Sequence, residues 1–150
     1  MIAATPLAHF WAAVIAVSIL IYVILDGFDL GVGMLFGLTR DEAKRRGMMA
    51  SLAPFWDGNE TWLVVIGASL FAAFPAVYAV FLGAFYIPVL LMLVGLIFRG
   101  VAFEFRYRSV QMRRVWDLGF VAGSALAAFV QGAAVGAMMR GINVVDRQFA

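Results

Sequence analysis

A run of 38 residues, from Thr61 to Phe98, contains no charged side chain. As one α-helix this run would be about 57 Å long, whereas about 20 helical residues cross the hydrocarbon of a bilayer. It therefore predicts two membrane crossings with a reversal at Pro75, while Pro88 is an alternative break that we interpret as a kink. The composition supports a membrane protein, because 65% of the residues are hydrophobic and 13% are charged. Soluble domains have about 45–50% apolar and about 25% charged residues.

Two further apolar stretches predict the first and last crossings. The first begins at Thr5 and Pro6, which suit a helix cap and a first helical position. It stays uncharged up to Asp26, and no cleavage site follows, so we expect a retained span rather than a signal peptide. The expected fold is all-α: a polytopic membrane helix bundle, one transmembrane domain over 1–150, with about four transmembrane helices at about 7–37, 60–74, 80–102 and 118–139.

Charged segments at about 39–57 and 103–117 are predicted to be cytoplasmic loops. The side of the membrane reached after spans one and three holds nine of the eleven Lys and Arg residues: Arg40, Lys44, Arg45, Arg46, Arg99, Arg106, Arg108, Arg113 and Arg114. By the positive-inside rule this side is cytoplasmic, so both termini are predicted to be periplasmic. The first loop is expected to contain a short surface helix, capped by Thr39 or Asp41 and ending at Pro54.

Glycines recur at four-residue spacing within the predicted spans. The pairs are Gly27 and Gly31, Gly33 and Gly37, Gly119 and Gly123, and Gly132 and Gly136. Such pairs let helix backbones approach closely, which predicts tight helix packing; the alternative is helical flexibility without a partner.

Carboxylates within the predicted spans are the candidate functional residues. At 100° per residue, one face of span one carries a polar stripe: Ser18, Tyr22, Asp26, Asp29, Gly33 and Gly37. A central Asp costs about 2.5–3.5 kcal/mol on the insertion scale, so such acids face protein or water and often mark a proton path. The alternative is that Asp26 and Asp29 pair with Arg40 or Arg99 at the interface.

Three more acids flank spans two and three. Asp57 and Glu60 open span two; alternatively, Asp57 or Asn59 caps this helix, with Glu60 completing a capping box. Glu104 lies at the inner end of span three, where a salt bridge to a neighbouring arginine is the alternative. All five acids are predicted near one cytoplasmic membrane surface, so a proton entry path is the functional hypothesis.

The residues that are missing exclude several kinds of cofactor site. There is no cysteine and only one histidine, His9. One histidine cannot ligate several haems, and the methionines are interpreted as apolar filling. No metal-ligand spacing, nucleotide-binding loop or nucleic-acid patch is present, so no metal site and no nucleic-acid partner are expected. Ser124 and Gln131 are interpreted as hydrogen-bonding groups in helix packing.

Four segments resemble signatures of subunit II of the cytochrome bd family of quinol oxidases, including its cyanide-insensitive members. They are DGFDLGVGML at 26–35, APFWDGNETWL at 53–63, FAAFPAVY at 71–78 and FRGVAFEFR at 98–106. The resemblance implies a heterodimeric enzyme of the bacterial plasma (inner) membrane that oxidises quinol, reduces oxygen to water and generates proton motive force. It also implies that haems b and d and the quinol site belong to subunit I, so this chain binds none of them and is not catalytic alone.

The resemblance also implies roles for individual residues. Asp57 and Glu104 are the first candidates for a cytoplasmic proton path, and Asp26, Asp29 and Glu60 are the second. Trp56 is a candidate contact for a structural quinone. Family members are about twice as long and have about eight spans, so the chain looks like their N-terminal half, either a fragment or a split or truncated gene. Two alternatives stay open: a small proton-coupled membrane transporter and a purely structural assembly subunit.

Overall fold

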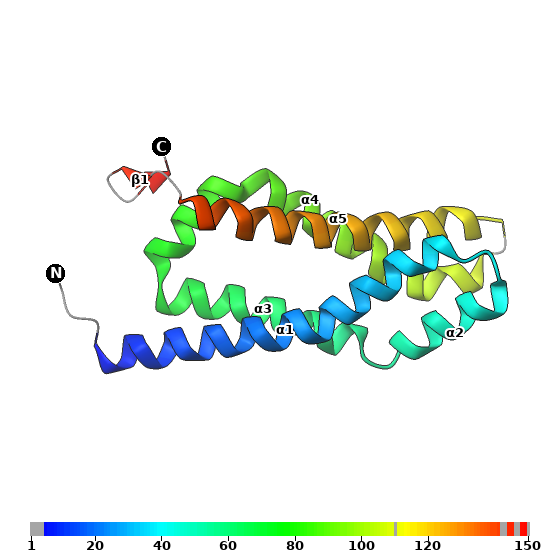
Figure 1. Ribbon diagram of the computed structural model, residues 1–150, viewed down its shortest axis with the longest axis horizontal. Helices are drawn as coiled ribbons and strands as arrows, with labels where there is room; N and C mark the ends of the chain where they lie inside the picture. The colour runs from blue at the N-terminus through cyan, green and yellow to red at the C-terminus, as the bar shows by residue number, and fades with distance from the viewer. Residues whose placement is uncertain (1–4, 110, 142–143, 146–147, 150) are drawn as a thin grey trace.

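Five helices make up nearly all of the structure, a computed structural model that describes residues 5–109, 111–141, 144–145 and 148–149. The helices are α1 (Pro6–Leu38), α2 (Glu42–Leu52), α3 (Trp56–Ala73), α4 (Pro75–Arg108) and α5 (Arg113–Arg140). A two-stranded antiparallel hairpin follows, made of β1 (Val144–Val145) and β2 (Gln148–Phe149). The four long helices run side by side along the length of the bundle, and α2 lies at one end of it (Figure 1). The predicted helical membrane bundle is confirmed.

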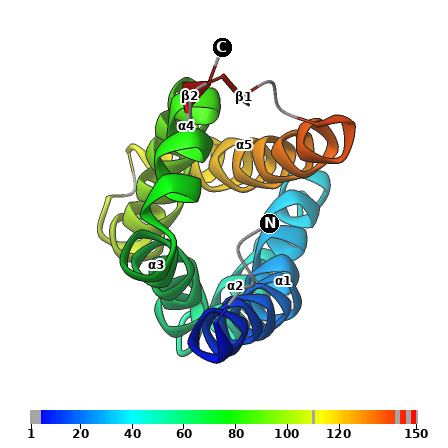
Figure 2. The same cartoon turned by 90° about the vertical axis from the view of Figure 1, so that its left-hand side faces the viewer.

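The four long helices form a ring when the bundle is viewed along its axis (Figure 2). Contacts join α1 to α3, α3 to α4, α4 to α5, and α5 back to α1. At the end of the bundle that carries the N-terminus, α1 and α3 lie in one layer and α4 and α5 in the other, whereas α1 approaches α5 at the opposite end (Figure 1). Helices α1 and α4 are therefore opposite one another in the ring, and side chains that link them cross its interior.

The helix ends follow local signals in the sequence. Thr5 caps α1, its Oγ1 accepting a hydrogen bond of 3.3 Å from the Ala8 amide, and Asp41 caps α2 through the Ala43 and Lys44 amides. The reversal at Pro75 is confirmed, because α3 ends at Ala73 and α4 begins at the proline. These caps and this turn agree with the sequence predictions.

Proline also bends α4 within its length. Pro88 lies inside the helix, and Phe85 three residues earlier has non-helical backbone angles of φ −117° and ψ 21°. A proline ring clashes with the carbonyl four residues before it and leaves one carbonyl without its amide partner. The helix kinks near Pro88 and does not reverse there, so Pro75 marks the reversal and Pro88 marks the kink.

Three of the helices in the described part of the chain, α1, α4 and α5, are long and apolar enough to cross a membrane. Helix α3 falls short of that standard because its first turns carry Asp57, Asn59 and Glu60. It nevertheless packs along α1. Helices α4 and α5 extend beyond the predicted spans 80–102 and 118–139, because helix continues through the charged turns that flank the apolar stretches.

The interior contains two apolar clusters. One is Leu30, Met92, Leu96, Ala127 and Val130, and the other is Phe36, Met49, Leu52, Ala102 and Phe120. Arg99 lies between these clusters along α4, because Leu96 before it belongs to the first cluster and Ala102 after it belongs to the second. The core is thus divided by a polar layer, and this layer is the candidate site described below.

Only half of the eight paired glycines lie against another helix. A Cβ on Gly33 would collide with the Ser124 side chain, and one on Gly123 with the backbone carbonyl of Gly95. Gly37 and Gly119 also face side chains of neighbouring helices. A Cβ on any of the other four would have no described atom within 4 Å: Gly27, Gly31, Gly132 and Gly136. For these four, the packing role stays a prediction, because their face of the helix meets no helix of the described part.

Candidate functional site

Arg99 is the centre of a buried polar cluster that joins α1, α3 and α4. Its side chain is 0% exposed, and its Nη1 lies 2.9 Å from Asp26 Oδ1 and 3.7 Å from Glu60 Oε2. Its Nη2 lies 3.5 Å from Asp29 Oδ2. One guanidinium therefore faces three carboxylates from two other helices. We call Asp26, Asp29, Asn59, Glu60 and Arg99 the Arg99 cluster.

The side chains of the cluster meet because of helix geometry. Asp26 and Asp29 are three residues apart on α1, so they point to the same face, and both are buried. Asn59 of α3 donates a hydrogen bond of 2.9 Å from Nδ2 to Asp29 Oδ2. Asn59 therefore does not cap α3, which begins at Trp56 with no capping side chain. The alternative capping box of Asp57 and Glu60 is also absent, because α3 begins at Trp56, before Asp57, and no side chain caps it.

The hydrogen bonding of the cluster is incomplete. Asp26 Oδ2, Glu60 Oε2 and Arg99 Nε are buried and have no hydrogen-bond partner among the described residues. Three carboxylates and one guanidinium would carry a net charge of −2 if all were ionised. Buried charges are expensive unless paired and hydrogen-bonded, so this arrangement is suited to binding a proton or another positive group.

A second hydrogen-bonded pair continues the polar stripe of α1 toward the other end of the bundle. Gln131 of α5 donates from Nε2 to the Tyr22 hydroxyl oxygen at 2.6 Å and lies 3.6 Å from Met92 Sδ. Ser18 and Ser124 donate to carbonyls of their own helices. Five of the six residues of the predicted polar face of α1 are buried, namely Ser18, Tyr22, Asp26, Asp29 and Gly33, whereas Gly37 near the end of the helix is exposed.

A hollow of about 460 Å³ leads from the surface to the edge of the cluster. It is lined by Ile24, Leu25, Phe28, Asp29, Ser51, Phe55 and Asn59. Its apolar walls are exposed, with Ile24, Phe28 and Phe55 all more than half accessible. Asp29 and Asn59 form its inner polar edge, so an entering proton would meet the cluster there.

The two first candidates for the proton path lie outside the cluster. Asp57 is exposed on the first turn of α3, and its backbone carbonyl accepts a hydrogen bond from the Thr61 hydroxyl. Glu104 is exposed on α4 and pairs with Arg108 one turn later. Trp56, the candidate quinone contact, stacks on Phe103 with ring centroids 5.0 Å apart. Of the five acids, the structure thus brings together Asp26, Asp29 and Glu60.

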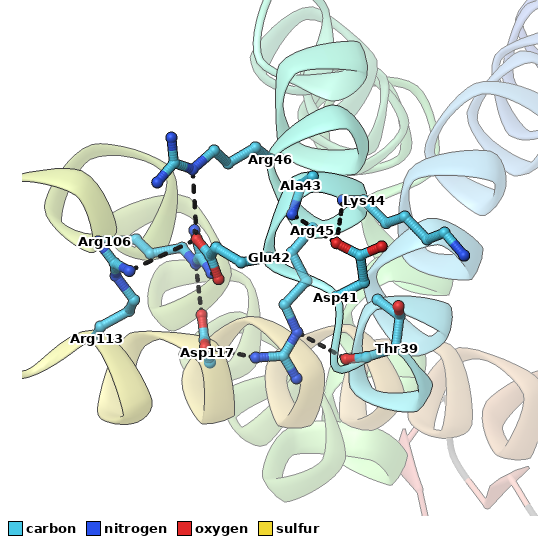
Figure 3. A network of polar contacts seen from close by, with 10 residues as sticks. All are labelled: Thr39, Asp41, Glu42, Ala43, Lys44, Arg45, Arg46, Arg106, Arg113 and Asp117. Atoms are coloured by element: carbon cyan, nitrogen blue, oxygen red, sulfur yellow. Dashed lines mark hydrogen bonds and ion pairs between the residues drawn. The ribbon is translucent and has the colours of Figure 1, made fainter.

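A separate ionic network holds α2 against the end of the bundle (Figure 3). Arg106 is 0% exposed; its Nη atoms donate to both Glu42 carboxylate oxygens at 3.2 and 3.0 Å, and its Nε donates to Asp117. Arg45 donates to Asp117 at 2.9 Å and to the Thr39 carbonyl at 2.8 Å. These contacts tie α1, α2, α4 and α5 together. We call Thr39, Glu42, Arg45, Arg106 and Asp117 the Arg106 network.

The Arg106 network is expected to lose part of its stabilising effect at acidic pH. Hydrogen bonding to Arg106 holds the pKa of Glu42 below its ordinary value of 4.5. The ionised form is favoured by folding, so this stabilisation is fully present above that ordinary value and is lost as the pH falls through the lower, folded pKa. We expect Glu42→Gln to flatten the acid side of a plot of melting temperature against pH. Glu104→Gln, at a residue outside this network, is the control and should leave the decrease in melting temperature at acidic pH unchanged.

The histidine and the two buried methionines of the described part of the chain do not form an axial haem site. His9, the only histidine of the chain, is exposed near the start of α1. Met92 contacts Gln131 through its sulfur, and Met49 is packed in an apolar cluster, so neither faces an open site for an iron. No group of acids and histidines that could hold a metal ion is found in the described part of the chain.

Sequence reasoning missed several contacts of these two sites. It left Arg99 as one of two possible partners for the α1 acids, interpreted Asn59 as a cap and did not single out Asp117. Two signals were present in the sequence: a lone arginine that directly follows a charge-free run of 38 residues, and an acid that directly precedes the last apolar stretch. Charges at such positions need buried or interfacial partners, although spacing alone does not say which.

Known proteins show the same sequence pattern. A family model described as cytochrome bd terminal oxidase subunit II matches residues 7–150. The chain is 40% identical over 139 residues to the cytochrome bd-I ubiquinol oxidase subunit 2 of Escherichia coli K12, covering 91% of this chain and 37% of that protein. It is 39% identical over 137 residues to the cytochrome bd ubiquinol oxidase subunit 2 of Bacillus subtilis, covering 89% of this chain and 40% of that protein.

A third relative is the probable cytochrome oxidase subunit 2 of Haemophilus influenzae, 39% identical over 139 residues, with 91% of this chain and 37% of that protein covered. The chain spans about two fifths of the length of these curated relatives, somewhat less than the half that the resemblance implied. The match nevertheless extends over nearly all of this chain. The chain therefore belongs to the cytochrome bd terminal oxidase subunit II family.

Proposed function

We propose that this chain acts as part of subunit II of a bd-type terminal quinol oxidase. In this role it supports a haem-bearing subunit I, which oxidises quinol and reduces oxygen to water, and the complex generates proton motive force. The observation that supports the proposal is the family match over residues 7–150, together with relatives that are named as ubiquinol oxidase subunits. In this proposal haems b and d belong to the partner subunit.

We propose that α3 joins α1, α4 and α5 as a fourth membrane crossing, within a single transmembrane domain. The side chains of these helices support a lipid environment, since large apolar residues are exposed along all four. The end of the bundle that carries α2 and the Arg106 network is the cytoplasmic end, because most basic residues gather there. Both termini are then on the periplasmic side.

We propose that the acids of this chain line a proton path from the cytoplasm. Asp57 and Glu104 lie exposed at the mouth, and Asp26, Asp29 and Glu60 lie inside it. The hollow that ends at Asp29 and Asn59 supports the inner part of this path, because it joins the outside of the bundle to the Arg99 cluster. Trp56 stays a candidate contact for a structural quinone; its stacking on Phe103 gives it a fixed orientation.

The test of the oxidase function is purification of the full-length protein with its partners from a membrane. Absorbance bands of haems b and d should co-purify with this chain only when a larger subunit is present, and the complex should consume oxygen with quinol. If the chain alone drives proton-coupled substrate uptake and no haem co-purifies, the proposal is wrong and the transporter alternative is correct.

Two substitutions test the proton path. We expect Asp57→Asn and Glu104→Gln each to lower quinol-driven oxygen consumption and proton uptake, by up to the 10²–10⁴-fold typical of lost proton-transfer groups. Arg108→Gln is the matched control for Glu104, because it breaks the same surface ion pair but keeps the acid. Unchanged turnover in both acid variants would leave only the structural assembly role.

A further inference from the structure

We propose that the Arg99 cluster holds one bound proton, carried by Glu60, when the protein is at rest at neutral pH. The proposal rests on the proposed function, in that it names the group that stores a proton inside the path. It goes beyond that function because it assigns a protonation state to one residue, which can be measured without oxidase turnover.

Glu60 and Asp26 converge on one nitrogen of Arg99. Asp26 Oδ1 lies 2.9 Å from Nη1, a hydrogen-bonded ion pair, whereas Glu60 Oε2 lies 3.7 Å from the same atom. The longer distance is too great for a good hydrogen bond. Arg99 therefore compensates Asp26 and contributes less to Glu60, although Glu60 Oε2 is buried.

An unpartnered oxygen shows where the proton would lie. Glu60 Oε2 is buried and has no hydrogen-bond partner among the described residues, whereas the Tyr22 hydroxyl lies beside Asp26 and can donate to it. An ionised Glu60 would leave this oxygen without a donor and would be repelled by Asp26. A proton bonded to Glu60 Oε2 removes one negative charge from the buried cluster and turns the unpartnered acceptor into a donor.

The groups around Glu60 leave it poorly compensated. Asp26 and Asp29 on α1 and Asp57 on its own helix are acidic, and Arg99 on α4 is positive but lies beyond good hydrogen-bonding distance and is shared with Asp26 and Asp29. With Glu60 neutral, Arg99 faces two carboxylates, and Asn59 already donates to one of them. A metal cation is the less favourable occupant, because no acid group suited to a metal ion is found among the residues described.

This arrangement gives the proton a route and a holding site. It enters from the hollow at Asp29 and Asn59 and binds Glu60, and it leaves when Glu60 ionises. Glu60 is the most accessible acid of the cluster, with its side chain 24% exposed. Asp26 is fully buried and stays paired with Arg99, so it does not carry the proton.

The test uses infrared difference spectroscopy on the purified full-length complex as the pH is raised. We expect a C=O stretch from a protonated carboxylic acid at neutral pH that disappears at alkaline pH, and we expect Glu60→Gln to remove this band completely. The exposed Glu104→Gln is the control and should leave it unchanged. The absence of any Glu60-dependent band would overturn the proposal.

Melting temperature provides an independent measurement. Because Gln resembles the neutral acid, Glu60→Gln should melt at the wild-type temperature while the wild-type Glu60 is protonated. It should lack the decrease in melting temperature that we expect in wild type as the pH rises through the titration of Glu60. A large decrease at neutral pH, including failure to fold, would instead mean that Glu60 is ionised. Stabilisation of wild type by added sodium, lost in Glu60→Gln, would show that a cation occupies the site. These readouts need no oxidase activity, so their failure is distinct from failure of the proposed function.

Discussion

Replacing Arg99 with Gln is expected to destabilise the folded chain by about 3–5 kcal/mol, the usual cost of removing one partner from a buried ion pair. Arg99 is 0% exposed, and Asp26 and Asp29 beside it are almost completely buried, so no water takes over the lost interaction. Three helices depend on this contact, since Arg99 joins α4 to α1 and α3. We expect little folded protein in the membrane and a lower melting temperature in detergent.

A matched control and a rescue variant separate the buried charge from side-chain volume. Arg108→Gln removes an exposed arginine from the same helix and should change stability by no more than about 0.5 kcal/mol. The double variant Arg99→Gln, Asp26→Asn removes the charge that the first substitution leaves unpaired, so it should recover part of the stability. If Arg99→Gln is as stable as Arg108→Gln, the cluster carries little energy and the interpretation of the polar layer is wrong.

Periodicity along one helix was sufficient to predict the polar face that forms half of the site. Residues at positions 18, 22, 26, 29 and 33 share a face because of the helix repeat alone, and all are buried in the structure. The reversal at Pro75 and the caps at Thr5 and Asp41 follow from equally local chemistry. Features set within a few residues of the chain were therefore predicted correctly.

Most contacts between helices were not predicted, because they depend on how each helix is rotated about its axis. The pairing of Asp26 and Asp29 with Arg99 was given only as one of two alternatives. Asn59 looks like a cap in the sequence, yet α3 begins three residues earlier and turns this side chain toward Asp29. Gln131 meets Tyr22 across 109 residues of sequence, and Arg106 meets Glu42 across 64. No spacing rule connects such positions. Packing decides them, as it decides which four of the eight paired glycines lie against a helix.

The two buried arginines differ in what surrounds their acids. Around Arg99, the paired carboxylates of Asp26 and Asp29 are as buried as the arginine itself. Around Arg106, Glu42 and Asp117 retain 37% and 14% of their exposure, and each acid has other arginines nearby. Water and neighbouring charges can therefore replace part of what Arg106 provides. The Arg106 network should tolerate loss of its centre better than the Arg99 cluster.

Replacing Arg106 with Gln is expected to cost about 3 kcal/mol, at the low end of the range for breaking a buried ion pair. The bidentate bond to Glu42 and the bond to Asp117 disappear together, and Glu42 lies on α2. The guanidinium of Arg106 also lies 5.2 Å from the centre of the Phe36 ring, a contact that Gln would not reproduce. The loss should therefore be concentrated at the end of the bundle that α2 covers (Figure 3).

Hydrogen exchange measured along the chain tests this localisation. In Arg106→Gln we expect the amides of α2 to exchange faster than in wild type, while those around Tyr22 and Gln131 near the middle of the bundle keep their protection. Arg46→Gln is the matched control, because Arg46 also faces Glu42, at 3.6 Å, but its side chain is 64% exposed. It should leave α2 protected, since exposed pairs contribute about 0–1 kcal/mol. Equal loss of protection throughout the bundle would contradict a local clamp and would mean that Arg106 supports the whole fold.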